Sequence, residues 1–126
     1  MSKKILLTNN APAPIGPYSQ AVQTGNLLFI SGQIPIDPAT GELNNKDIAT
    51  ETHQVMLNLK AILTEAGMSF DNVIKTSIFL TDMKQFGTVN EVYGGFFTSD
   101  PPARETVQVS ALPKFVNVEI SMIAAK

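Results

Sequence analysis

The chain has 126 residues and a formal net charge of −2, with 44% hydrophobic and 16% charged residues. This length predicts a single domain over residues 1–126, and the composition is that of a folded globular protein, not of a disordered one. Cysteine is absent, which excludes a disulfide framework, a thiolate nucleophile and a cysteine-based zinc site.

Location and partners follow from the same composition. The apolar run from Ile5 to Leu7 is too short for a signal peptide, and no stretch approaches the roughly 20 apolar residues of a membrane span. We therefore expect a cytoplasmic protein without a membrane partner. The basic residues are scattered lysines and a single arginine, without the dense basic stripe typical of nucleic-acid binding. Nucleic acid is accordingly not an expected partner.

The N-terminal part of the chain predicts a small antiparallel unit. Residues 4–7 are predicted to form a short edge strand, and the proline-rich residues 9–17 an ordered, extended connection. Residues 19–24 and 27–33 are compatible with β-strands and flank a Gly-Asn dipeptide. Such a two-residue link is typical of a β-hairpin.

The clearest helix is predicted from residue 47 to residue 66. Apolar side chains recur there at spacings of three and four, which gives one apolar face. Asp47 is expected to cap the N-terminus, and Gly67 suits the left-handed conformation that ends a helix.

The second half of the chain predicts a strand over 72–80, a helix over 86–98, and two further strands over 104–109 and 116–123. Alternation along the first of these strands places four side chains on one face: Ile74, Thr76, Ile78 and Leu80. The whole order predicts an α+β fold in which two amphipathic helices cover one face of a mixed β-sheet. Apolar residues on the other face predict an oligomer.

Arg104, the only arginine of the chain, opens a predicted strand after the stiff residues 101–103. A guanidinium is always charged, and its rigid fork matches a carboxylate in a bidentate manner. We interpret Arg104 as an anchor for a small carboxylate ligand. A surface salt bridge or a solvated charge at the strand end explains the spacing equally well.

Glu119 lies on the polar side of the last predicted strand. If the strands 104–109 and 116–123 pair as a hairpin, their apolar faces coincide, so Arg104 and Glu119 come within reach across the strands. A carboxylate beside a cationic anchor can transfer protons or orient water. The alternative is an exposed ion pair of little energetic value.

Other candidate residues carry weaker signals. His53, the only histidine, lies in the middle of a helix beside the apolar stripe, and we expect a solvated or structural role for it. No spacing of histidines and carboxylates predicts a metal site. Ser31 and Gly32 end an apolar strand, where glycine permits a bulge or a close approach to a ligand. Tyr18 offers a ring wall and a hydroxyl, or covers a sheet edge.

Several segments together resemble the RidA family, also called the YjgF family. They are residues 14–20 (PIGPYSQ), 28–33 (LFISGQ), 102–109 (PARETVQV), 112–113 (LP) and 118–120 (VEI). They occur in the family's order and without large gaps, so the resemblance covers nearly the whole chain.

The resemblance implies a chorismate-mutase-like α+β fold, assembled as a homotrimer with ligand sites between subunits. It also implies hydrolysis of reactive enamines and imines, such as 2-aminoacrylate and 2-aminocrotonate, to 2-keto acids and ammonia. This activity serves metabolite damage control and uses neither a metal nor a cofactor, and the partner is a small imino or keto acid.

The resemblance also assigns roles to individual residues. Arg104 lies where the family has the arginine that binds the substrate carboxylate, and Glu119 where it has the glutamate proposed to position or activate water. Thr106 lies where many members have cysteine, and the backbone there contacts the ligand. Three more residues match positions that line the pocket: Tyr18, Ser31 and Gly32.

Two other functions are associated with this family. Some members regulate amino acid or purine metabolism, so the same cleft would bind a small carboxylate without turnover. RNA cleavage or translation inhibition has been attached to others, but the charge pattern of this chain gives that function little support.

Overall fold

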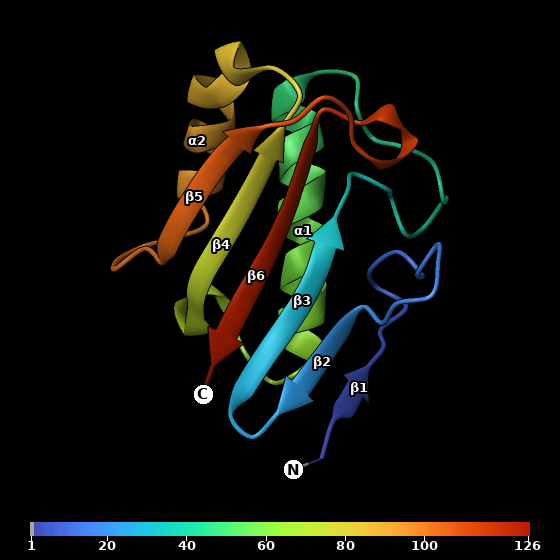
Figure 1. Ribbon diagram of the computed structural model, residues 1–126, viewed down its shortest axis with the longest axis vertical. Helices are drawn as coiled ribbons and strands as arrows, with labels where there is room; N and C mark the ends of the chain where they lie inside the picture. The colour runs from blue at the N-terminus through green and yellow to red at the C-terminus, as the bar shows by residue number, and fades with distance from the viewer. Residues whose placement is uncertain (1) are drawn as a thin grey trace.

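A six-stranded β-sheet forms one layer, and two α-helices lie against one of its faces (Figure 1). The computed structural model describes residues 2–126. The strands are β1 (Lys4–Leu6), β2 (Ala21–Thr24), β3 (Leu27–Gln33), β4 (Val73–Leu80), β5 (Ala103–Gln108) and β6 (Val118–Ala125). The helices are α1 (Ile48–Glu65) and α2 (Phe86–Gly94). The predicted α+β architecture is confirmed.

The strand order across the sheet is β1-β2-β3-β6-β4-β5. The pair β4–β5 is parallel, and the other four pairs are antiparallel. The last strand, β6, therefore lies in the middle of the sheet, between β3 and β4 (Figure 1).

The hairpin predicted between the last two strands is wrong, because β4 separates β5 from β6. Two parallel neighbouring strands need a crossover connection, and α2 provides it between β4 and β5. After β5 the chain passes over β4, and β6 pairs with the far edge of β4. Sequence spacing alone cannot reveal this insertion.

In the N-terminal half the predicted hairpin and the predicted ends of the first helix are confirmed, whereas β2 begins at Ala21 and not at residue 19, and residues 9–17 contain turns and bends where an extended connection was predicted. β2 and β3 pair as a hairpin around Gly25, whose φ of 57° suits a residue without a Cβ. The Asp47 carboxylate accepts a hydrogen bond from the Thr50 N–H at 2.7 Å and caps α1. Gly67 follows the helix with a φ of 71°.

The alternation predicted along β4 is wrong at the start of the strand. A register shift between Val73 and Lys75, where β4 pairs with β6, inserts an extra residue into the ladder. As a result Val73 is buried on the face of Thr76, whereas Ile74, which the alternation had placed with Thr76, is 49% exposed. The residues Thr76, Ile78 and Leu80 do share the buried face.

Helix α2 is shorter than predicted. It ends at Gly94, where two successive glycines lower helix propensity, instead of continuing to residue 98. Phe96 and Phe97 pack beyond its end against Phe70, with ring centroids 5.4 Å apart in both pairs. Within residues 2–126, neither helix is long and apolar enough to cross a membrane.

The core lies between the helices and the sheet. It contains apolar side chains from α1 and from the central strands, many of them with no exposed surface: Leu28, Val55, Met56, Leu59, Leu63, Leu80, Val118 and Ile120. Because β6 lies in the centre of the sheet, the backbone before and after Glu119 is held in place. Val118 and Ile120 point into the core, so the Glu119 side chain between them points away from the helices.

Candidate functional site

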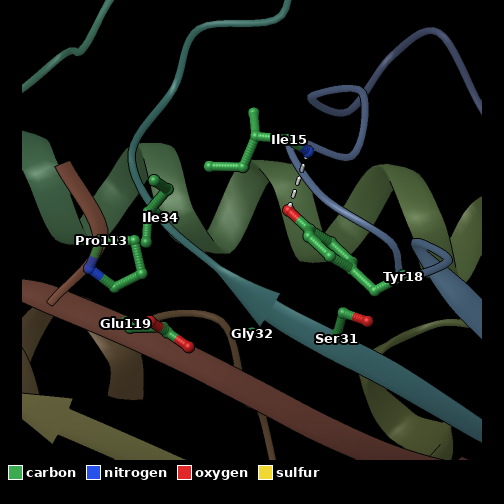
Figure 2. Close-up of a pocket in the computed structure, with 7 residues that line it drawn as sticks. All are labelled: Ile15, Tyr18, Ser31, Gly32, Ile34, Pro113 and Glu119. Atoms are coloured by element: carbon green, nitrogen blue, oxygen red, sulfur yellow. Dashed lines mark hydrogen bonds between the residues drawn. The ribbon is translucent and has the colours of Figure 1, made fainter.

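A cavity of about 310 Å³ lies where the loop between β1 and β2 meets the adjoining ends of β3 and β6. This volume is at the lower end of the range of about 300–1,000 Å³ for small-molecule sites. Apolar walls surround a few polar groups, as such sites require (Figure 2). The lining residues are Ile15, Tyr18, Ser31, Gly32, Ile34, Pro113 and Glu119.

An irregularity in β3 makes room for the Glu119 side chain. The pairing of β3 with β6 shifts register between Ile30 and Gln33, which places a bulge at Ser31 and Gly32. A Cβ at position 32 would overlap Oε2 of Glu119 and lie 2.9 Å from its Cδ. The predicted bulge is therefore present, and the glycine is needed there for the close approach of the Glu119 side chain.

The Glu119 carboxyl is half-buried, and this burial raises its pKa above the ordinary value of 4.5. Within residues 2–126 no hydrogen bond to the Glu119 carboxyl is found, and desolvation is the cause of the raised pKa. A carboxyl group that is poorly solvated and whose pKa is shifted toward neutrality is suited to proton transfer.

Tyr18 and Ser31 present hydroxyl groups to the same cavity. The Tyr18 hydroxyl accepts a hydrogen bond from the Ile15 N–H at 3.2 Å, so its own hydrogen can donate to a ligand (Figure 2). The Ser31 hydroxyl donates to the Ser19 carbonyl at 2.6 Å, which leaves its oxygen lone pairs as acceptors. Both side chains are thus held in fixed orientations at the cavity wall.

Gln20 stabilises the loop that carries Tyr18, and sequence reasoning gave it no role. Its buried amide donates to the carbonyls of Thr8 (3.0 Å), Ala11 (3.3 Å) and Pro12 (2.9 Å), and accepts from the Thr8 N–H at 2.7 Å. The sequence carried no local signal for this role, because Gln20 precedes a strand of mixed polarity, Ala21–Thr24, and only the fold shows that its amide is buried and needs partners.

Arg104 lies outside this cavity, on the helix-covered side of the sheet. Its Nη1 donates to the Asn90 Oδ1 of α2 at 2.6 Å. Its Cζ lies 5.6 Å from the Phe86 ring centroid and 5.2 Å from that of Tyr93, distances typical of cation–π contact. One face of α2 therefore fixes the guanidinium while leaving it partly exposed.

The predicted contact between Arg104 and Glu119 does not form within one chain. Arg104 is aligned with Thr76 of β4, and Glu119 with Phe79, three residues along the same strand. An odd offset puts the two side chains on opposite faces of the sheet. With one strand between them, their Cα atoms are about 14 Å apart.

Thr106 lies on the same face of β5 as Arg104, two residues further along the strand. Its hydroxyl oxygen is buried and has no hydrogen-bond partner among the described residues. Buried polar groups are normally paired, so an unpaired hydroxyl beside a partly exposed arginine marks a place where a polar ligand group fits. Arg104 and Thr106 form a second polar cluster, separate from the cavity.

His53 is exposed on the outer surface of α1, with its ring centroid 5.6 Å from that of Phe96. This is the solvated position expected from the sequence. No group of three or more histidine, cysteine, aspartate or glutamate side chains within residues 2–126 is arranged to bind a metal ion.

The comparisons with known proteins agree with this fold. A family model described as Endoribonuclease L-PSP matches residues 8–126. The RutC family protein PH0854 of Pyrococcus horikoshii is 55% identical over 124 residues, which are 98% of each chain. The 2-iminobutanoate/2-iminopropanoate deaminase of Mus musculus is 48% identical over 124 residues, covering 98% of this chain and 92% of that protein.

A solved structure, that of E. coli TdcF with bound serine, is 44% identical and has a TM-score of 0.94, with 98% of each chain covered. The fold and these matches define a member of a family of small α+β proteins. The chain belongs to the Endoribonuclease L-PSP family, which includes the proteins named RutC, RidA and YjgF. The resemblance to the RidA family is confirmed.

Proposed function

We propose that this protein hydrolyses small reactive imines and enamines, such as those derived from 2-aminoacrylate and 2-aminocrotonate, to 2-keto acids and ammonia. The observation that carries the proposal is the Glu119 carboxyl, half-buried in a small cavity, with its pKa raised by burial and Gly32 directly against it. The deaminases of mouse and rat, 48% and 46% identical to this chain, support the same reaction.

The proposed reaction needs one water molecule and one proton acceptor. The Glu119 carboxylate accepts a proton from water as the oxygen attacks the imine carbon. The carbinolamine then collapses to the carbonyl: Glu119 returns its proton to the leaving nitrogen and accepts the hydroxyl proton, which departs with the ammonia as ammonium and leaves the carboxylate free again. The products are one 2-keto acid and one ammonia, and no cofactor takes part. Because a protonated imine is already electrophilic, positioning supplies much of the acceleration.

The substrate carboxylate needs a cationic partner, and Arg104 is the residue proposed for this role. Since Arg104 and Glu119 lie on opposite faces of one sheet, we propose that they meet across two chains of a homotrimer. Arg104 and Thr106 of one subunit would then face Tyr18, Ser31 and Glu119 of the next. The serine bound in the related TdcF structure supports an α-carboxylate as the ligand group.

The endoribonuclease activity in the family description is not the function proposed here. Binding of a nucleic-acid backbone relies largely on clustered positive charge, and this chain has a net charge of −2, with a single arginine and lysines scattered along the sequence. That arginine contacts Asn90, Phe86 and Tyr93 at the edge of the sheet, in surroundings that suit one small anion. We place the proposed activity in the cytoplasm, in the removal of damaging intermediates.

A coupled assay tests the proposal. A threonine dehydratase generates the imine in solution, and the release of ammonia and 2-ketobutyrate is followed with and without this protein. We expect the wild-type protein to accelerate release and the Arg104→Ala variant to lose most of this acceleration at low substrate concentration. Full acceleration by the variant would contradict the role of Arg104.

The same assay separates catalysis from regulation. The wild-type protein would then fail to accelerate the reaction but would bind 2-ketobutyrate in calorimetry, and Arg104→Ala would abolish this binding. That pair of results would favour a non-catalytic sensor of small carboxylates over an enzyme.

A further inference from the structure

Strands β3 and β6 separate at the cavity, so the backbone groups that no longer pair between these strands need other hydrogen-bond partners. The last pairing between them joins Gln33 to Ile120, so Val118 has no partner on β3. Figure 1 shows the chain turning away from β6 after the end of β3. We call this opening the fork, with Ile34 on the β3 arm and Val118 on the β6 arm. The cavity lies in the fork, because Ile34 and Glu119 both line it.

Along the β6 arm, a buried carboxylate accepts backbone hydrogen bonds where β3 no longer pairs. Glu51, in the first turn of α1, has no exposed surface. Its Oε2 accepts hydrogen bonds from the backbone N–H groups of Asn117 (2.6 Å) and Val118 (2.9 Å), and its Oε1 accepts one from the Asn117 side-chain amide (2.9 Å). These bonds satisfy the edge of β6 immediately before Glu119.

A second buried side chain of α1 supports the other arm. The Asn58 amide, 1% exposed, donates to the carbonyl oxygens of Ile34 (3.1 Å) and Ile36 (3.0 Å). Its Oδ1 accepts from the Gln54 amide at 2.9 Å. Residues 51, 54 and 58 are spaced three and four apart, so they lie on one face of the helix. One rigid helix therefore contacts both arms of the fork.

The free-energy cost of burying the Glu51 carboxylate indicates that this residue does more than stabilise the fold. Burying a carboxylate without a cationic partner is unfavourable, and hydrogen bonds only offset the penalty. The single ion pair within residues 2–126 joins Lys75 to Glu105, so Glu51 has no cation beside it. Its three bonds go to the two residues directly before Glu119. An apolar side chain would suit a simple contact between helix and sheet.

We infer that Glu51 and Asn58 are positioning residues, which keep the two arms of the fork apart so that the Glu119 carboxyl lies at a fixed place beside Gly32. The inference rests on the proposed function. Neither residue touches the substrate. Glu51 acts through the backbone of Asn117 and Val118, and Asn58 acts through the carbonyl groups of the opposite wall.

A swapped pair of side chains tests the β6 arm. N117D places a carboxylate oxygen against Oε1 of Glu51, so the two carboxylates repel. In the double variant E51Q/N117D the glutamine amide donates to the new aspartate, and the net charge equals that of the wild type. We expect N117D to lower kcat about tenfold with little change in KM, and the double variant to restore it. The extra carboxylate of N117D could also shift the pH dependence of kcat without moving Glu119. The kcat is therefore measured on the pH plateau, where Glu119 is ionised, so that a change in kcat reports displacement of the Glu119 carboxyl.

A matched control uses the same exchange at the other end of β6. The Asn72 amide donates to the Ala125 carbonyl at 3.1 Å, far from the cavity. N72D should lower the urea midpoint while leaving the plateau kcat at the wild-type value. If N117D behaved like N72D, or if the double variant stayed as slow as N117D, Glu51 would have only a structural role.

An uncharged variant tests the inference without any turnover. Asn58→Ala removes both bonds to the β3 arm, and the Glu119 carboxyl is titrated by carbon-13 NMR in folded protein. We expect its midpoint to fall toward the ordinary value, because the loosened wall admits water. An unchanged midpoint in folded N58A would overturn the inference. Absence of wild-type deamination would refute the proposed function alone, since this titration does not depend on it.

Discussion

Gly32→Ala is the substitution for which the structure gives the sharpest expectation. The new methyl group would overlap Oε2 of Glu119, and its Cβ would lie 2.9 Å from Cδ and 3.1 Å from Cγ. Carbon atoms in contact are normally about 3.5–4.0 Å apart, so the carboxyl group must move by about 0.6–1.1 Å. The backbone at Gly32 does not have a positive φ, so alanine adds no backbone strain there.

We expect Gly32→Ala to lower the activity strongly while changing the stability little. A displaced Glu119 rotamer costs about 0.5–1.5 kcal/mol. Replacing glycine by alanine gains about 0.4–1 kcal/mol through the unfolded state. The free energy of unfolding should therefore change by less than about 1 kcal/mol. A carboxyl misplaced by about 1 Å should lower kcat about 100-fold, which corresponds to about 2.7 kcal/mol of activation free energy.

The assay compares kcat in the coupled deaminase reaction with urea unfolding of the same samples. Gly94→Ala is the matched control, since a Cβ there has nothing within 4 Å. It should keep wild-type kcat. A Gly32→Ala protein with wild-type kcat would refute the argument that Gly32 exists to admit Glu119. A loss of kcat that merely followed a loss of folded protein would refute it as well.

Two further predictions concern the partners of the site. Asn90→Ala removes the hydrogen bond to Arg104. Because hydrogen bonds to charged groups contribute about 1.5–3 kcal/mol, KM for the imine should rise about 10- to 100-fold, with a smaller effect on kcat. An unchanged KM would show that the Arg104 guanidinium does not need Asn90 of α2 to hold it in position. Glu119→Gln should lower kcat more than ligand binding, and it should also change the pH dependence of stability. Because the folded-state pKa of Glu119 is raised above 4.5, its contribution to stability is present below the unfolded value and is lost as pH rises through the folded value. Urea unfolding should therefore show Glu119→Gln gaining stability over the wild type at pH 7 but not at pH 4, and an equal difference at both would contradict the burial of this carboxyl.

Much of the local structure could be predicted from the sequence because its causes are local. The Gly-Asn link specifies a tight hairpin, and Asp47 and Gly67 mark the ends of α1 through capping and a positive φ. Tyr18 and Gly32 were identified by motif, and both line the cavity. These signals depend on a few neighbouring residues, which the sequence displays directly.

The position of Arg104 relative to Glu119 depended on strand order, which has no local signal. Strands β5 and β6, which carry Arg104 and Glu119, each have polar residues on one side and apolar residues on the other, so the sequence pattern was compatible with a direct hairpin between them. The insertion of β6 between β3 and β4 is favoured by burial of its apolar residues in the centre of the sheet, a property of the whole fold.

The sequence by itself therefore determined the element types, the family and the chemical types of the candidate residues. Only the tertiary structure decided which of them meet. It separated Arg104 from Glu119 by placing them on opposite faces, and it brought Glu51 of the first helix to the backbone beside Glu119. The physical reason is that side-chain chemistry is encoded residue by residue, whereas contacts between distant strands arise from packing one shared core.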